Sequence, residues 1–145
     1  MSTKHDAMIA YLQPHVQSVI GNNLNFNVSV GTPDSIAFIP EYANKFIKRM
    51  LRGSGTKEYG FAIIITKQFS VGSDDLNLLA MNMAQAFNDW IDTQNTAKLF
   101  PDFGVKCQVR KIEPVQNMPN LADVNIEESI AKYMLQCKVT YYEEV

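Results

Sequence analysis

The sequence is poor in the side chains that most often build catalytic and metal sites. Its 145 residues include two histidines, two cysteines and one tryptophan. His5 and His15 are ten residues apart in one expected helix, which places them on different sides of that helix and nearly three turns apart. Two ligands so placed cannot share a metal ion. We therefore expect both histidines to be solvated helix side chains, and we expect no metal or other cofactor.

Motifs for nucleotide binding and nucleophilic chemistry are also missing. The segment Gly53-Ser-Gly-Thr-Lys57 lacks the G-x-x-x-x-G-K-[ST] spacing of a phosphate loop, and no G-x-S-x-G elbow precedes a helix. Three acidic pairs, at 74–75, 127–128 and 143–144, lie at expected helix starts or at the end of the sequence, where no catalytic partner is apparent. These absences indicate a protein that is not an enzyme. A small α+β ligand-binding domain or enzyme built from ordinary polar residues remains an alternative.

Excess charge and long apolar runs are absent as well. The net charge is −2 and the charged fraction is 19%, which argues against a general attraction to nucleic acid or to an anionic membrane. No apolar run approaches the roughly 18 residues that span a bilayer, and the first residues lack a signal-peptide pattern. We expect a soluble protein made in the cytoplasm. In that reducing compartment Cys107 and Cys137 should remain buried free thiols.

Two segments alternate apolar and polar residues almost without error. Val105 to Ile112 and Tyr133 to Tyr142 both have the period of two that is typical of a half-buried strand. We expect these strands to form one wall of the core.

Two amphipathic helices are expected. Apolar residues at helical spacing predict the first from Met8 to Ile20, with Thr3 as a possible cap. Pro14 predicts a kink there or a division into two short helices. The second runs from about Asp74 to about Thr93 after Ser73 as the cap. Its predicted buried stripe comprises Leu76, Leu79, Ala80, Met83, Phe87, Trp90 and Ile91.

The region between these helices is expected to be mainly strands. Alternation predicts one strand from Leu24 to Val30, and a second should run from Ser35 to Ile39 and end at Pro40. A near-continuous apolar run from Phe61 to Ile65 suits a central strand. Between the second helix and the closing strand, residues 113–125 are expected to form a loop rich in proline and asparagine.

Residues 44–52 are ambiguous. Their apolar residues recur at helical spacing, which favours a helix. The glycine-rich turn at 53–55, followed at once by a strong strand, favours a hairpin instead.

The same region holds the one concentration of basic residues. Three roles stay open for it: a solvated face or hairpin tip, a surface for a protein partner, or a non-specific contact with the phosphates of passing DNA. The cluster comprises Lys45, Lys48, Arg49, Arg52 and Lys57.

Several short segments carry a family resemblance over roughly residues 40 to 145. They are Phe61-Ala-Ile-Ile, Trp90-Ile-Asp-Thr-Gln, Phe100-Pro-Asp-Phe-Gly104, Asn117-Met-Pro-Asn-Leu-Ala122 and Ala131-Lys-Tyr-Met-Leu-Gln-Cys-Lys-Val-Thr-Tyr-Tyr-Glu143. In this order they resemble the minor capsid proteins of long-tailed bacteriophages and prophages, a group similar to the tail terminator proteins.

The length of 145 residues fits one domain, over residues 1–145. The resemblance implies that this domain is non-enzymatic and α+β, tail-terminator-like, with a mostly antiparallel mixed sheet and two main helices packed on it. It implies that residues 44–52 are a strand of a hairpin. It further implies a homohexameric ring in the virion, assembled in the host bacterial cytoplasm, which caps the tail tube and joins the head. The implied partners are further copies of the chain, the tail tube protein and a head-completion or connector protein. Another head–tail connector or neck component is the nearest alternative.

Overall fold

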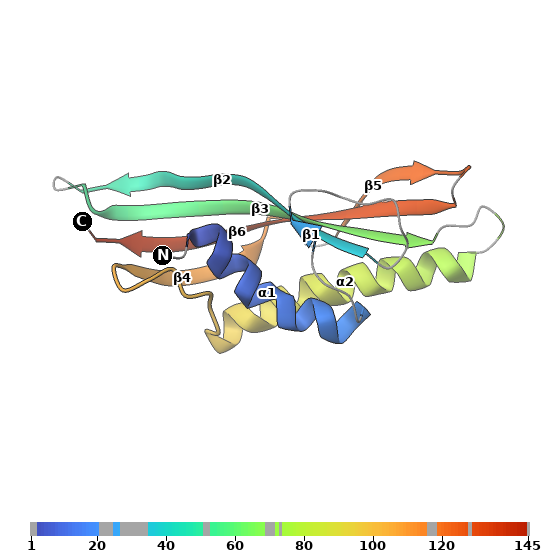
Figure 1. Cartoon of the computed structure of the whole chain (residues 1–145), viewed down its shortest axis with the longest axis horizontal. Coiled ribbons are helices and arrows are strands. Elements are labelled where there is room, and N and C mark those ends of the chain that lie inside the picture. Colours follow the sequence, from blue (N-terminus) through green and yellow to red (C-terminus); the bar gives the residue numbers. More distant parts are fainter. Residues whose placement is uncertain are drawn as a thin grey trace.

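The computed structural model describes residues 3–20, 25–26, 35–50, 53–68, 72, 74–115, 119–127 and 129–144. Two helices lie on one face of a six-stranded sheet (Figure 1). The expected α+β class, with a mostly antiparallel mixed sheet and two main helices, is confirmed. The elements are α1 (Lys4–Ile20), β1 (Asn25–Phe26), β2 (Ser35–Arg49), β3 (Gly55–Gln68), α2 (Asp74–Ala97), β4 (Cys107–Pro114), β5 (Asn120–Asn125) and β6 (Ile130–Glu143).

Strand β6 lies inside the sheet and pairs with three other strands. One edge of β6 pairs with β3 along its whole length. The other edge is shared by two strands, because β4 pairs with the C-terminal half of β6 and β5 with the N-terminal half. All these pairings are antiparallel, and only the two-residue β1, which lies beside β2, is parallel among the described strands. The two halves of the sheet are therefore joined through β6.

The hairpin expected around residues 53–55 is present, so the helical alternative for residues 44–52 is wrong where those residues are described. Strands β2 and β3 pair from Ser35 opposite Thr66 to Arg49 opposite Gly55. Gly53 has a φ of 86°, and its N–H donates to the carbonyl of Met50 at 3.2 Å. This left-handed backbone conformation is readily available to glycine.

The expected end of a strand at Pro40 is wrong. Strand β2 continues past this residue through three register shifts. Proline lacks the N–H that would bond a neighbouring strand, but β1 pairs only with Ala37 and Phe38. Pro40 therefore lies on an unpaired stretch of the described edge, where a missing donor is tolerated.

The alternation predicted for Tyr133 to Tyr142 is confirmed. Every second residue of this segment is buried against the helices, at 0–3% exposure. Opposite them, Tyr59, Phe61, Ile63 and Ile65 of β3 lie on the same face of the sheet. The helices add Met8, Leu12 and Val16 from α1, and Ala80, Ala84, Phe87 and Ile91 from α2.

Helix α1 begins with the predicted cap. The N–H of Asp6 donates to Oγ1 of Thr3 at 3.1 Å, and the N–H of Thr3 donates to Oδ2 of Asp6 at 2.9 Å. This reciprocal pair is a capping box. A division of the helix at Pro14 is wrong, because α1 is one helix. Pro14 and Ala10 are both exposed, so water can reach the carbonyl that loses its helical partner.

Helix α2 begins at Asp74 as expected and ends at Ala97, four residues later than expected. Its buried stripe differs from the prediction at three positions. Leu79 is 65% exposed, and Met83 and Trp90 are only partly buried at the edge of the core. The small side chains of Ala80 and Ala84 face the sheet instead, which allows the helix backbone to approach it closely. The side chain of Leu76, also predicted in this stripe, lies outside the described residues. The proposed cap, Ser73, lies outside the described residues.

The segment between α2 and β6 differs most from the expectation. Val105, predicted to begin a strand, lies in a turn and is fully exposed. That turn includes Gly104, with a φ of 109°, whose N–H donates to Oδ1 of Asp102 at 3.0 Å. The loop expected at 113–125 is wrong for residues 113–114, which end β4, and for residues 120–125, which form β5. Of the strand expected from Leu24 to Val30, only Asn25–Phe26 lies within the described residues.

Candidate assembly surface

The basic residues predicted as one cluster are divided between the two faces of the β2–β3 hairpin. Lys45 pairs with Glu58 and Lys48 pairs with Thr56, which places both lysines on the face away from the helices. Arg49 and Lys57 lie on the helix-bearing face, because their cross-strand partners there are Gly55 and Phe46. Arg52 lies outside the described residues. The structure therefore does not bring the described members together into one patch.

On the helix-bearing face, two cations surround one aromatic ring. The guanidinium of Arg49 lies 4.2 Å from the centroid of Phe46, and Nζ of Lys57 lies 4.6 Å from it. Such cation–π contacts hold the basic side chains over the ring.

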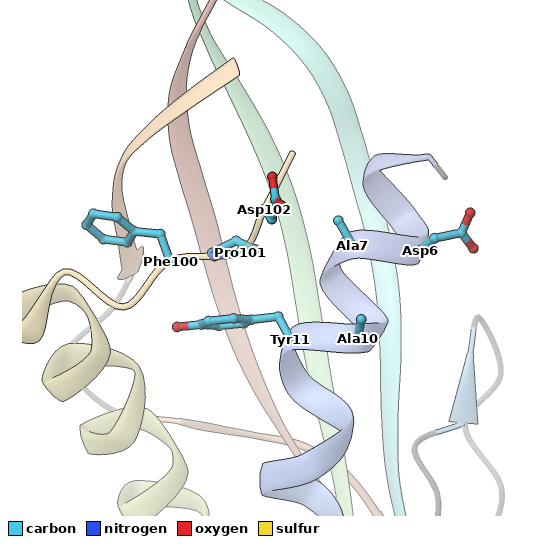
Figure 2. Close-up of a pocket in the computed structure, with 7 residues that line it drawn as sticks. All are labelled: Asp6, Ala7, Ala10, Tyr11, Phe100, Pro101 and Asp102. Carbon is cyan, nitrogen blue, oxygen red and sulfur yellow. The ribbon is translucent and has the colours of Figure 1, made fainter. Parts of the chain in front are cut away.

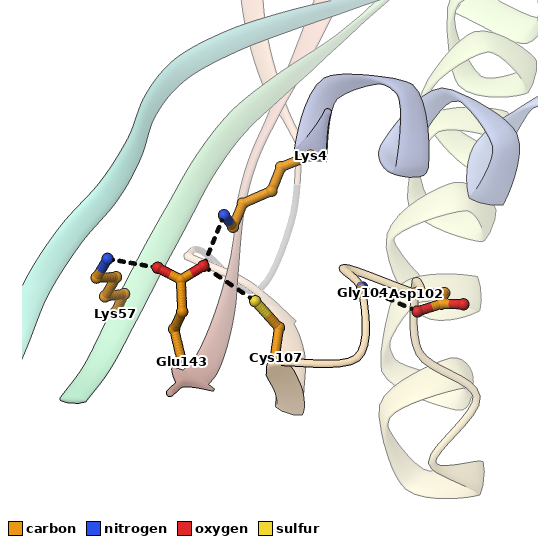
Figure 3. Close-up of polar contacts among 6 residues, drawn as sticks. All are labelled: Lys4, Lys57, Asp102, Gly104, Cys107 and Glu143. Carbon is orange, nitrogen blue, oxygen red and sulfur yellow. Dashed lines mark hydrogen bonds and ion pairs between the residues drawn. The ribbon is translucent and has the colours of Figure 1, made fainter. Parts of the chain in front are cut away.

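Lys57 is further constrained by the carboxylate of Glu143. Its Nζ donates to Oε1 of Glu143 at 2.6 Å, while Nζ of Lys4 and the thiol of Cys107 donate to Oε2, each at 3.1 Å (Figure 3). The carboxylate thus ties together α1, β3, β4 and β6. Lys57 serves this internal contact, so it is a poor candidate for contact with a partner.

These contacts shift two pKa values. Partial burial disfavours the charged form of Glu143, but the hydrogen bonds from Lys57, Cys107 and Lys4 outweigh it and lower the pKa to about 2. Burial, followed by the hydrogen bond to Glu143, raises the pKa of Cys107 to about 11. The Cys107 thiol is therefore protonated at neutral pH and a weak nucleophile.

The open face of the sheet carries a row of alternating charges. The hydroxyl of Tyr42 donates to Glu58 at 3.0 Å, and Nζ of Lys45 lies 5.3 Å from the Tyr42 ring centroid. Lys138 lies 3.8 Å from the carboxylates of both Glu58 and Glu113. Burial and the hydrogen bond to Glu58 raise the pKa of Tyr42. This row crosses β2, β3, β6 and β4.

The position of Tyr42 in this row depends on the absence of a side chain at Gly60. A Cβ atom on Gly60 would lie 2.3 Å from the ring of Tyr42, a separation that two carbon atoms do not tolerate. The ring therefore lies directly over the backbone of β3 at Gly60. Among the basic residues predicted as a site, Lys45 and Lys48 remain exposed on this open face.

The two histidines are not fully solvated, contrary to the expectation, because both are partly buried. Nδ1 of His5 lies 2.5 Å from the hydroxyl of the buried Tyr59. The ring of His15 stacks on Trp90, with centroids 3.9 Å apart and planes 6° from parallel. Burial lowers the pKa of His15. Both side chains therefore help to dock α1, and within the described residues no group of three histidine, cysteine or acidic side chains could hold a metal ion.

The two thiols differ from each other. Cys137 is buried as expected, and burial raises its pKa to about 12. Cys107 is only partly buried. Both are free, because β4 and β6 pair in a register that places Cys107 opposite Glu143 and Cys137 opposite Pro114.

A cleft of about 460 Å³ lies between α1 and the segment that follows α2. Tyr11 points toward Phe100 and Pro101, whereas the carboxylate of Asp6 points away from them (Figure 2). The hydroxyl of Tyr11 donates to the carbonyl of Leu99 at 2.6 Å. The cleft wall is mainly apolar, and its described lining residues include no set of acid, base and nucleophile. Its chemistry suits packing better than catalysis.

Comparison of the sequence with protein-family models and with curated proteins gives no match. Neither helix of the described chain combines the length and apolar character needed to cross a bilayer.

Sequence reasoning missed the contacts of Glu143 and of the histidines. Glu143 is 139, 86 and 36 residues from Lys4, Lys57 and Cys107 along the chain. No local motif joins residues so far apart. The one usable signal was the strong alternation of β6, which places Glu143 on the same side of the strand as the buried Tyr141.

Proposed function

We propose that this chain is a structural protein of a bacteriophage or prophage virion, specifically a tail terminator. In this role a ring of six copies caps the tail tube, ends its growth and presents the surface that joins the head. The proposal rests on the resemblance to the minor capsid proteins and tail terminators, which extends over roughly residues 40 to 145.

One observation about the matched segments supports this proposal. Three of the five resembling segments fall on β3, α2 and β6, which pack into one core. Their residues Phe61, Ile91 and Leu135 are 0–2% exposed. The resemblance therefore includes residues of the core as well as residues of the surface.

The β2–β3 hairpin is the part of the fold that best suits contact with a neighbour. It extends past the first turn of α1 (Figure 1) and carries Lys45, Lys48 and Arg49 as exposed cations. A ring subunit needs complementary patches on two sides of a rigid domain. The hairpin can supply one of them, or it can contact passing DNA through its phosphates.

The proposal is tested by adding the purified, tagged chain to tail tube protein from the same virion during tube assembly. We expect label at one end of each tube in negative-stain images, and tubes that stop growing. Tube ends without label would contradict the terminator role. Label that joins the connector protein but not the tube would instead identify a neck component.

Particle production gives a second test. The double variant Lys48→Glu, Arg49→Glu changes two exposed side chains, so it should fold normally but reduce the yield of infectious particles. Lys98→Glu, an exposed lysine after α2, is the matched control. An unchanged particle yield with the double variant would show that these hairpin cations have no role in assembly or in DNA passage.

A further inference from the structure

The outer side of α2 exposes two adjacent leucines, and every charged residue of this helix is acidic. Leu78 and Leu79 are 60% and 65% exposed. Along the same helix, Asp89 and Asp92 are exposed, and α2 contains four aspartates with no lysine, arginine or glutamate. We call Leu78, Leu79, Asp89 and Asp92 the helix surface. Adjacent exposed leucines on one helix are typical of a protein contact.

The far side of the sheet has the complementary chemistry. Tyr42 and Ile47 of β2 are 36% and 53% exposed, and Lys45 and Lys48 are exposed on the same strand. We call these four residues the hairpin surface. Tyr42, Lys45 and Lys48 lie on the face opposite the helices, as their pairing with Gly60, Glu58 and Thr56 requires, and Ile47 is the bulged residue beside Lys48. The helix surface therefore combines apolar groups with anions. The hairpin surface combines apolar groups with two lysines, and the neighbouring carboxylate of Glu58 accepts the hydrogen bond from Tyr42.

A shallow apolar groove extends the helix surface toward α1. It is lined by His15, Met83, Ala86 and Phe87, and its volume is about 100 Å³. Among the described residues, no lysine or arginine lines it. The groove offers an apolar site on α2, the helix that also carries Asp89, and suits a side chain with an aliphatic stem and a cationic end.

We propose that the helix surface of one copy binds the hairpin surface of a second copy. The binding partner is a second copy of the chain, because the charges of the two surfaces are complementary. Because the surfaces differ and lie on opposite sides of the domain, the contact is heterologous, and repetition of it can close into a ring. The inference rests on the proposed function, since it names the contact by which ring subunits would join.

Sedimentation velocity at low ionic strength, over a wide range of protein concentration, tests the contact. We expect the wild-type chain to associate, and we expect added salt to weaken the association. The helix variant Asp89→Lys, Asp92→Lys and the hairpin variant Lys45→Glu, Lys48→Glu should each weaken self-association by at least about tenfold, because each places like charges against each other.

Mixing the two variants distinguishes this contact from a general effect of charge on association. In the mixture, each reversed surface meets a surface of opposite charge, so association should return. Asp123→Lys and Lys98→Glu are the matched controls, because both residues are exposed outside the two surfaces. They should associate like the wild type, and circular dichroism should show that all four variants fold.

Several results would overturn the proposal. They are a wild-type chain that is monomeric at every concentration, variants that associate as the wild type does, and a mixture that does not recover. Loss of DNA binding by the hairpin variant with unchanged self-association would also overturn it, because the hairpin would then serve nucleic acid. If the chain does not label tube ends but the variants change self-association as expected, only the terminator role is removed. If the chain labels tube ends but the variants associate as the wild type does, only this contact is removed.

Discussion

Lys57 donates a hydrogen bond to Glu143 at 2.6 Å, and this ion pair joins the exposed hairpin to the central strand of the sheet. The second carboxylate oxygen binds Lys4, the first residue of α1. One side chain thereby fixes the position of the helix and of the hairpin relative to each other.

Replacement of Glu143 by glutamine should lower the free energy of unfolding by about 1 to 2 kcal/mol at neutral pH, because two ammonium groups lose a charged acceptor that is partly exposed. Urea denaturation measures this loss. Glu144→Gln, at the exposed neighbouring position, is the control and should have little effect.

The stabilisation by Glu143 should also depend on pH. The folded pKa of Glu143 is about 2, below its ordinary value of 4.5, so the unfolded chain binds the proton first as the pH falls. The stabilisation is therefore complete above pH 4.5 and is lost as the pH falls toward 2. The difference between wild type and Glu143→Gln should shrink over that range. A difference that stays constant down to pH 2 would show that the carboxylate is not responsible.

The thiol of Cys107 should react slowly with iodoacetamide at pH 8, because its pKa of about 11 leaves almost no thiolate. In Glu143→Gln the nearby negative charge is gone while Lys4 and Lys57 remain. The pKa should fall and alkylation should become faster. A Cys137→Ser background, read by mass spectrometry, isolates this thiol. Equal rates in the two proteins would argue against the contact between Cys107 and Glu143.

The fluorescence of Trp90 should report the titration of the stacked His15 imidazole. Trp90 is the single tryptophan, and protonation of a stacked imidazole changes its fluorescence. Because burial lowers the pKa of His15, the midpoint should lie below 6.5. By linkage, the folded state loses stability as the pH falls below 6.5, since the unfolded chain takes up the proton more readily. His15→Gln should abolish the transition and His5→Gln should preserve it.

Gly60→Ala should destabilise the protein by about 1 to 3 kcal/mol, because the new methyl group displaces the ring of Tyr42. Thermal unfolding provides the measurement. In a Tyr42→Ala background the same change should have a much smaller effect, since the space over Gly60 is then free. Equal effects in both backgrounds would show that the ring is not the cause.

The positions of helices and strands were predicted best from the sequence where one face of the element is buried. The alternation of Tyr133 to Tyr142 placed β6 correctly, and Thr3 placed the start of α1. Burial was harder to predict at the margins of the core. Leu79 matched the helical stripe but is exposed, because Ala80 and Ala84 face the sheet. Val105 matched the strand alternation, yet it lies in the turn that follows Gly104, and β4 begins only at Cys107.

The candidate site could be predicted less well than the fold. The sequence identified Lys45, Lys48, Arg49 and Lys57 as neighbours along the chain, but bulges in β2 decide which side each one faces. A shift of one residue moves a side chain to the opposite face of a sheet. The pairing of Lys57 with Glu143 depends on strand order, which local sequence does not encode.

The position of β6 also governs the order in which the chain can fold. Strands β2 and β3 form a local hairpin, but β4 and β5 pair with neither of them. Both of those strands meet the hairpin only through residues 130–143. During translation the sheet must therefore remain in two separate parts until that strand emerges from the ribosome. A copy interrupted before residue 130 would retain the basic hairpin without the carboxylate that fixes it, and would be excluded from any assembly that requires a rigid subunit.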